Sequence, residues 1–295
     1  MKISHKIRRK VIQICAFGFS NMHVENFFPK AKLYTGKWKS FCNPGLNCAS
    51  CPAAHLACPL GALQNLNGSS RIPFSLYITG FLLAVGTLLG RWVCGFLCPF
   101  GLVQELIGKI PVKKHRLPKW TRAVKYVLLV WFVLLWPLIQ KMQDVMGVGN
   151  PAFCEYICPA GLLTAGVPFL ATHSELQRTV GPVFSLKLII LVLTVVGCLF
   201  VFRFFCKVMC PLGAVYGLLN RISLYRLSVN EDACVHCGKC AAVCRMDVDP
   251  VRAPNSTECI RCGDCAHACP KGAIHIGFRA GCTARSIKNE GKMES

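Results

Sequence analysis

Acidic residues are scarce in this chain of 295 residues: 13 Asp and Glu stand against 34 Lys and Arg, which gives a formal net charge of +21. The clearest hydrophobic runs contain no Asp or Glu, so they show no proton path of the usual kind and argue against an ion-translocating subunit. No C-x-x-C-H haem-attachment motif is present. No nucleic-acid-binding signature accompanies the basic charge. The excess of Lys and Arg therefore predicts contact with anionic lipid or with an acidic partner protein, and not with nucleic acid.

Long apolar runs make the chain too hydrophobic for an ordinary soluble protein, with 53% apolar residues and a mean hydropathy of +0.45. Three runs approach the length of about 20 residues that a bilayer requires: Pro73–Gly90, Ala123–Ile139 and Pro182–Phe205. A basic segment, Met1–Lys10, precedes a weaker run at Val11–Phe28, which we interpret as an uncleaved, marginal first helix. The sequence thus predicts a membrane all-α fold with about four transmembrane helices.

Cysteine, by contrast, is abundant, with 21 residues. Between Cys234 and Pro270 the spacing C-x2-C-x2-C-x3-C occurs twice, and this run holds two [4Fe–4S] clusters in bacterial ferredoxins, where the fourth cysteine of each run binds the other cluster. A zinc site is the alternative, but zinc needs four ligands in two pairs and does not explain a doubled run of four. The predicted ligands are Cys234, Cys237, Cys240 and Cys269 for one cluster, and Cys259, Cys262, Cys265 and Cys244 for the second.

A different cysteine motif repeats through the apolar part of the chain. The pattern C-x3-C-P-x-G begins at Cys94, Cys154 and Cys206, and an incomplete copy, C-P-x-G, begins at Cys58. Cysteines four residues apart lie on one face of a helical turn, and the proline then breaks that helix. Each motif can therefore aim two sulfur atoms at one metal site.

The repeat and the ferredoxin run together predict the domain organisation. We expect a membrane domain over residues 1–223, built from two similar halves at about 11–110 and 123–222. A small α+β two-cluster ferredoxin domain follows over 224–282, and a polar tail covers 283–295. A domain as small as the ferredoxin has little apolar core, so bound clusters would stabilise its fold.

Counting membrane crossings places the motifs at Cys94 and Cys206 on the same side. A [4Fe–4S] cluster takes four thiolates and each motif supplies two, so two motifs on one side complete one cluster. Unligated cysteines at helix ends are the alternative. The predicted ligands of this third, inner cluster are Cys94, Cys98, Cys206 and Cys210.

The opposite side also carries thiols, and there the sequence leaves two interpretations open. The motif at Cys154 either joins two of Cys48, Cys51 and Cys58 around a fourth cluster, or these thiols form disulfides on an oxidising face. Cys51 and Cys58 fit ligation best because a proline follows each. The predicted outer set is Cys51, Cys58, Cys154 and Cys158.

The motif W-x-C-G-x-x-C-P-x-G at Trp92–Gly101, its repeat at Cys206–Gly213 and the two-cluster run that follows resemble the polyferredoxin-type membrane proteins of the NapH, NosR and CcoG kind. The resemblance implies an electron-transfer subunit of an oxidoreductase system, rather than a stand-alone enzyme. Such a subunit passes electrons between a cytoplasmic donor or quinol pool and a partner reductase. The CcoG-like alternative is a maturation factor that reduces metal ions or thiols, and a redox sensor is a further alternative. The loop Phe41–Gly61 departs from the NapH pattern.

Charge distribution predicts the orientation of the chain. Loop 91–122 has seven Lys and Arg and loop 140–181 has two, which places 91–122 in the cytoplasm, although loop 29–72 disagrees with five. Clusters need a reducing compartment, so we expect a multi-pass protein of the cytoplasmic membrane with its ferredoxin domain on the cytoplasmic side. The expected partners are the lipid bilayer, an acidic redox protein (a ferredoxin, a flavodoxin or a reductase subunit) and, through the resemblance, a quinone. Basic residues suited to steering the acidic partner are Lys109, Lys113, Lys114, Arg116 and Lys119.

Overall fold

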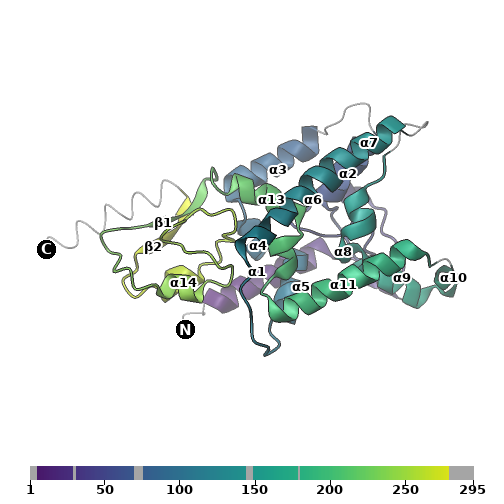
Figure 1. Ribbon diagram of the computed structural model, residues 1–295. Coiled ribbons are helices and arrows are strands. Elements are labelled where there is room, and N and C mark those ends of the chain that lie inside the picture. The colour runs from purple at the N-terminus through teal and green to yellow at the C-terminus, as the bar shows by residue number, and fades with distance from the viewer. Residues whose placement is uncertain (1–4, 29–30, 70–75, 144–148, 179, 279–295) are drawn as a thin grey trace.

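The computed structural model describes residues 5–28, 31–69, 76–143, 149–178 and 180–278. The molecule is elongated: helices occupy most of its length, and a small region with two strands lies at one end (Figure 1). Long helices run along the long direction of the molecule, and short helices lie between them.

The helices fall into two parts, before and after residue 110. The first half contains α1 (His5–Ser20), the 3-10 turns η1 (Val24–Phe27) and η2 (Lys37–Ser40), α2 (Pro59–Ser69), α3 (Leu76–Leu89), α4 (Trp92–Phe96) and α5 (Pro99–Ile107). The second half contains η3 (Lys119–Ala123), α6 (Val124–Leu128), η4 (Leu129–Leu135), α7 (Trp136–Gln143), η5 (Phe153–Ile157), α8 (Pro159–Gly161), η6 (Leu162–Gly166), α9 (Val167–Thr172), α10 (Ser174–Gln177), α11 (Pro182–Phe200), α12 (Phe204–Val208) and α13 (Pro211–Leu219). Both halves therefore end on a short helix, a C-P-x-G motif and a second short helix, α4 with α5 and α12 with α13.

Two continuous helical stretches among the described residues are long and apolar enough to cross a membrane: Lys119–Gln143, with 25 residues, and Pro182–Phe200, with 19. The first of them passes without a break through η3, α6, the π-helical turn η4 and α7. The predicted run Pro73–Gly90 appears as α3, whose described part has 14 residues, and residues 73–75 lie outside the described residues. Two candidate spans thus stand where the sequence predicts about four.

The last predicted span ends as a helix five residues early, at Phe200. Arg203 has a φ of 53°, in the left-handed region, and its side chain is fully buried. The chain therefore turns at this residue, and Phe204 starts the separate helix α12. The sequence run Pro182–Phe205 therefore consists of an apolar helix followed by a turn at the buried Arg203.

The first helix differs more from its prediction. Helix α1 begins at His5, inside the basic segment, and ends at Ser20, so it does not cover Val11–Phe28. Arg9 and Gln13 are buried on the face that packs against α4 and α5. Glu105 forms ion pairs with both Arg9 and Lys10. The basic residues of this helix bind the protein instead of only flanking an apolar span.

The region after residue 223 is a small α+β unit. Strands β1 (Tyr225–Val229) and β2 (Ile274–Phe278) pair antiparallel, with Tyr225 opposite Phe278. The short helices α14 (Lys239–Val243) and α15 (Asp264–Ala268) follow cysteine-rich turns and contact each other. Among its described residues, the separate core consists of Leu227, Cys240, Cys265 and Ile274, so apolar packing alone stabilises it weakly.

A buried ion-pair group attaches this small unit to the helices. Glu258, which is 3% exposed, pairs with Arg91 and Lys125, and both cations are fully buried. Burial alone would raise the pKa of Glu258, but the two cations outweigh it and hold the pKa below its usual range. Arg91 also donates to the carbonyl of Thr257 at 2.6 Å, and Asn220 donates to the carbonyls of Ser256 and Cys259 at 2.7 and 3.0 Å.

Replacing Glu258 by glutamine should loosen this attachment. The substitution leaves Arg91 and Lys125 buried without their counter-charge, and breaking a buried pair in this way costs about 3–5 kcal/mol. We expect faster hydrogen–deuterium exchange in residues 255–261, measured by mass spectrometry on the intact protein. Asp249→Asn is the matched control, because the partner of Asp249, Arg252, is exposed. Equal exchange in both variants would contradict the role of Glu258.

Candidate metal centres

Each C-P-x-G motif forms the start of a helix. Cys98 and Cys210 stand in extended backbone just before α5 and α13, and the proline is the first residue of each helix. The sulfur of Cys98 accepts a hydrogen bond from the amide of Gly101 at 3.4 Å, and that of Cys210 from Gly213 at 3.3 Å. The proline thus begins the next helix, whereas the sequence interpretation only has it break the previous one. Helix N-terminal amides place positive partial charge at each sulfur.

The other two motifs repeat this geometry. Cys58 precedes α2 and Cys158 precedes α8, each followed by proline. Burial raises the pKa of Cys158 to about 12, while hydrogen bonds from the amides of Gly161 and Ala160 partly oppose that rise. All four C-P-x-G cysteines are therefore buried thiols that face backbone amides.

The cysteine turns of the ferredoxin-like unit are shaped by left-handed residues. His236 and Gly238 in the first run have φ values of 50° and 71°, and Arg261 and Gly263 in the second have 51° and 86°. Alternation of right- and left-handed residues turns successive amides toward one concavity, which suits an anionic group. The two runs therefore share one backbone design at equivalent positions.

The ferredoxin-like unit brings its cysteines together in two groups. One cavity is lined by Cys234, Cys237, Cys240 and Cys269. In the second group, burial and then the charges of Cys259, Cys262 and Cys244 raise the pKa of Cys265. Each group thus brings together three cysteines from one run and the fourth from the other.

The inner thiols also converge, although they come from different halves of the chain. Cys94, Cys98, Cys206 and Cys210 are all buried. Burial, then Cys206 and Cys94, raise the pKa of Cys98 to about 12. The same two thiols and Cys98 act on Cys210. The four sulfur atoms therefore lie within electrostatic reach of one another.

Two buried arginines cross between the inner motifs. Arg91 stands three residues before Cys94 but donates to the carbonyl of Cys206 at 3.2 Å. Arg203 stands three residues before Cys206 and donates to the carbonyl of Cys94. Both arginines are fully buried, and each has a carboxylate partner, Glu258 for Arg91 and Glu105 for Arg203. Each half of the chain thus positions a cysteine of the other half.

The outer group contains Cys48 where the sequence analysis prefers Cys51. The charges of Cys158, Cys58 and Cys48, after burial, raise the pKa of Cys154. Cys51 packs with Ala53 and Ala54 in a small cluster that Cys48 also contacts, and its sulfur forms a hydrogen bond with Thr164. No C-P-x-G sequence starts at Cys51, so no helix begins there to aim its sulfur at the group. Among the described residues, no cysteine of this region forms a disulfide.

Two glutamines that the sequence analysis overlooked bond the sulfur atoms. Gln104 donates to the sulfur of Cys206 at 3.1 Å, and Gln64 donates to the sulfur of Cys154 at 3.3 Å. Each stands six residues after a C-P cysteine, in the longer pattern C-P-x-G-x-x-Q of α2 and α5. Extending the repeat by three positions would have found them.

A short loop joins the inner and outer groups. The amide of Leu46 donates to the sulfur of Cys98 at 3.4 Å, and the amide of the next residue, Asn47, donates to the sulfur of Cys58. Consecutive residues are 3.8 Å apart, so these two sulfurs lie within about 10 Å of each other. Tyr216 is fully buried and donates a hydrogen bond to the carbonyl of Pro44 at 2.9 Å. Burial, and then thiols of both groups, raise the pKa of Tyr216. The two groups are therefore neighbours inside the protein.

The inner group also lies against the second ferredoxin group. A Cβ atom added to Gly95 would come within 2.7 Å of the carbonyl oxygen of Ile260, so the two backbones touch. Cys244 and Cys262 pack against the same apolar core that contains Cys94. The second ferredoxin group and the inner group therefore lie next to each other, and the outer group follows the inner one.

The donor sets suit iron–sulfur clusters better than single ions. Among the described residues, no group of three or more His, Cys, Asp or Glu side chains is tight enough to hold one metal ion. A [4Fe–4S] cluster binds its thiolates through different iron atoms, so its ligands stand farther apart than those of one ion. Four cysteines per group and no histidine match the cluster donor set. Burial raises the pKa of Cys98, Cys158 and Cys210, so bound metal would have to displace the protons of these thiols.

Comparisons with known proteins agree with this donor set. Two family models described as "4Fe-4S binding domain" match the chain, one at residues 71–118, 145–171 and 186–229, and the other at 227–248 and 253–275. No solved structure matches.

Three relatives show how far the similarity extends. The Putative electron transport protein YccM of Escherichia coli is 29% identical over 72% of this chain and 60% of its own length. Uncharacterized protein MJ0750 of Methanocaldococcus jannaschii is 30% identical over 65% of this chain and 74% of its own length. The Methylamine utilization ferredoxin-type protein MauN of Paracoccus denitrificans is 33% identical over 58% of this chain and 52% of its own length. The chain therefore spans only 60% of the length of YccM.

The choice between Cys48 and Cys51 can be tested by metal analysis. Cys48→Ser should remove one ligand of the outer group and lower the iron content by about four atoms per chain, because one cluster would be lost. Cys51→Ser is the matched control, three residues away, and should keep the full iron content. Iron and acid-labile sulfide are measured on anaerobically purified protein. Loss of iron in the Cys51 variant but not in the Cys48 variant would reverse the assignment.

Proposed function

Because the chain belongs to the polyferredoxin-type family of 4Fe-4S binding proteins, we propose that it is a membrane electron carrier with four [4Fe–4S] clusters. The clusters would supply one-electron redox chemistry, and the protein holds them in order. The ligands are those of the two ferredoxin groups, the inner group, and an outer group of Cys48, Cys58, Cys154 and Cys158.

The succession of thiol groups carries this proposal. The second ferredoxin group packs against the inner group, and the amides of Leu46 and Asn47 reach the inner and outer groups from consecutive positions. Electrons would therefore pass from the ferredoxin unit to the inner group and then to the outer group. Burial of the four inner thiols keeps water away from them, and fixed amides and arginines would compensate the cluster charge without reorganising.

Apolar surface supports a position in the membrane. Helix α11 exposes large apolar side chains along its length, and the stretch Lys119–Gln143 does the same. Exposed apolar residues of α11 include Leu186, Ile189, Val192, Leu193 and Val196. An apolar surface of this extent fits lipid better than water. In this proposal the ferredoxin unit lies outside the bilayer, on the cytoplasmic side.

A basic groove supports an acidic redox protein as the partner at that side. A cavity of about 580 Å³ is lined by Lys109, Lys114, Arg116 and Lys207, together with Cys244 of the second ferredoxin group. Asp247 there pairs with Lys207 and Arg116, which leaves the groove positive overall. Positive charge beside a cluster ligand would steer an acidic carrier to the place where electrons enter or leave.

A second cavity supports the quinol pool as the other partner. It has a volume of about 320 Å³ and lies between α1, α5 and η6, with mostly apolar walls such as Phe17, Phe100 and Leu163. Cys48 and Cys51 also line it, so a lipid-soluble carrier in this cavity would contact the outer group directly. The volume lies within the range of about 300–1,000 Å³ usual for small-molecule pockets.

One observation favours a second candidate function, reduction of metal ions or thiols for the maturation of another protein. Cys51 lies outside the outer group but beside Cys48, and it lines the apolar cavity. A thiol at the end of the electron path could pass electrons to a bound metal ion or disulfide. Unchanged electron transfer in Cys51→Ser would speak against this role, since a carrier without a working thiol does not need Cys51.

Cys98→Ser tests the path itself. It should remove the inner cluster, leave the ferredoxin clusters reducible, and slow reduction of the outer cluster at least tenfold, because the intermediate carrier is gone. Freeze-quenched EPR after mixing with a reduced acidic ferredoxin follows each cluster. Cys15→Ser, an exposed thiol outside all groups, is the control. Only two cluster signals in the unmodified protein would remove the proposed path.

The glutamine contacts predict separate changes in two potentials. Gln104→Leu removes the hydrogen bond to Cys206 and should lower the midpoint potential of the inner cluster by roughly 50 mV, because that bond favours the more negative, reduced state. Gln64→Leu should do the same for the outer cluster alone. Redox titration monitored by EPR measures both. A shift of the same cluster in both variants would contradict the assignment of the two groups.

A further inference from the structure

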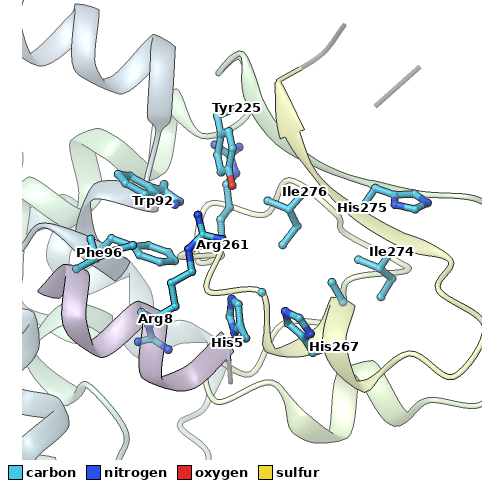
Figure 2. A pocket seen from close by; sticks show the side chains of 14 residues that line it. His5, Arg8, Trp92, Phe96, Tyr225, Arg261, His267, Ile274, His275 and Ile276 are labelled. Carbon is cyan, nitrogen blue, oxygen red and sulfur yellow. The ribbon is translucent and has the colours of Figure 1, made fainter. Parts of the chain in front are cut away.

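A cavity of about 360 Å³ lies between the start of α1, helix α4 and the ferredoxin-like unit (Figure 2). It has no part in the proposed electron path. Its walls share two properties: most of them are basic or aromatic, and none of the lining residues is acidic. The basic and aromatic members are His5, Arg8, Arg9, Arg261, His267, His275, Trp92, Phe96 and Tyr225.

The cations of this cavity are not all neutralised by the protein. Glu105 pairs with Arg9, whereas among the described residues no carboxylate forms an ion pair with Arg8. Arg261 is 2% exposed and donates to the carbonyls of Leu89 and Asn220, but its Nε atom has no hydrogen-bond partner among the described residues. A buried donor without a partner costs free energy, so the cavity favours an anionic ligand that accepts hydrogen bonds.

The aromatic side of the cavity suits a planar ring. Trp92 and Phe96 stack with their ring centres 4.6 Å apart and an interplanar angle of 13°. Tyr225 meets Trp92 edge-on at 6.1 Å. Figure 2 shows these three side chains on one side of the cavity and His267 with the strand residues Ile274–Ile276 on the other. Flat walls of this kind bind aromatic ligands by stacking.

The wall of the cavity that lies opposite Trp92 and Phe96 belongs to the ferredoxin-like unit. Gly263 directly follows Cys262, and Ala266 and His267 follow Cys265. A ligand in the cavity would therefore lie against the backbone that holds the second ferredoxin group.

We propose that this cavity binds a phosphate-bearing aromatic mononucleotide, with flavin mononucleotide as the representative ligand. The phosphate would accept hydrogen bonds from Arg8 and Arg261, and the ring would lie against Trp92, which Phe96 supports by stacking. The volume is near the lower end of the usual range of about 300–1,000 Å³, which favours a mononucleotide over a dinucleotide. Binding itself does not require the proposed electron path, so the two ideas can fail separately.

The test is calorimetric titration of the intact, cluster-loaded protein in nanodiscs of phosphatidylcholine. Flavin mononucleotide should bind at least tenfold more tightly than riboflavin, which has the same ring and no phosphate. Arg8→Gln should abolish that difference and leave riboflavin binding unchanged. Trp92→Leu should weaken both ligands. EPR of the same samples reports whether the clusters are intact in each variant.

Arg252→Gln is the matched control, because it removes an exposed arginine of the ferredoxin unit that does not line the cavity. It should bind both ligands as the unmodified protein does. Equal affinity for flavin mononucleotide and riboflavin, or an equal loss in both arginine variants, would overturn the proposal. So would loss of flavin mononucleotide binding in nanodiscs that contain phosphatidylglycerol, since a lipid phosphate would then be the natural occupant.

Discussion

The crossed pair of buried arginines is the interaction on which the arrangement of the thiols depends. Arg91 and Arg203 each bind a cysteine carbonyl of the opposite half, so neither half can position its motif without the other. Both cations lie in the protein interior, where an unpaired charge would be too costly. Glu105 and Glu258 supply the counter-charges. The same contacts therefore join the halves and surround the inner thiols with positive charge.

Each counter-charge also recruits a further part of the chain. Glu105 draws Arg9 and Lys10 of α1 onto α5, which brings the first helix against the inner motifs. Glu258 comes from the ferredoxin-like unit and so fixes that unit over Arg91. Because Glu258 is adjacent to Cys259, the ion pair sets where the second ferredoxin group meets the inner one. The ion pairs therefore also help to determine the order in which the thiol groups follow one another.

Short helices explain how so many thiols fit into one interior. A C-P-x-G motif begins a helix at its cysteine, and the first amides of that helix face the sulfur. Repeating the motif four times brings four such sulfurs to the centre without long connecting segments. The loop that carries Leu46 and Asn47 then offers amides to two groups at once, which keeps the inner and outer groups close together.

Sequence spacing by itself was enough to predict the two ferredoxin groups and the meeting of Cys94 and Cys98 with Cys206 and Cys210. Those groups depend on local turns and on an internal repeat, both of which are written in the order of residues. Only the tertiary structure brings the thiol of Cys48 near Cys154 and Cys158, and packs Arg9 of α1 inside the protein. It also brings the inner and outer thiols close together, with the loop of Leu46 and Asn47 contacting both groups. These features depend on contacts between segments far apart in the chain, and residue spacing carries no information about which of two nearby cysteines a distant helix will meet.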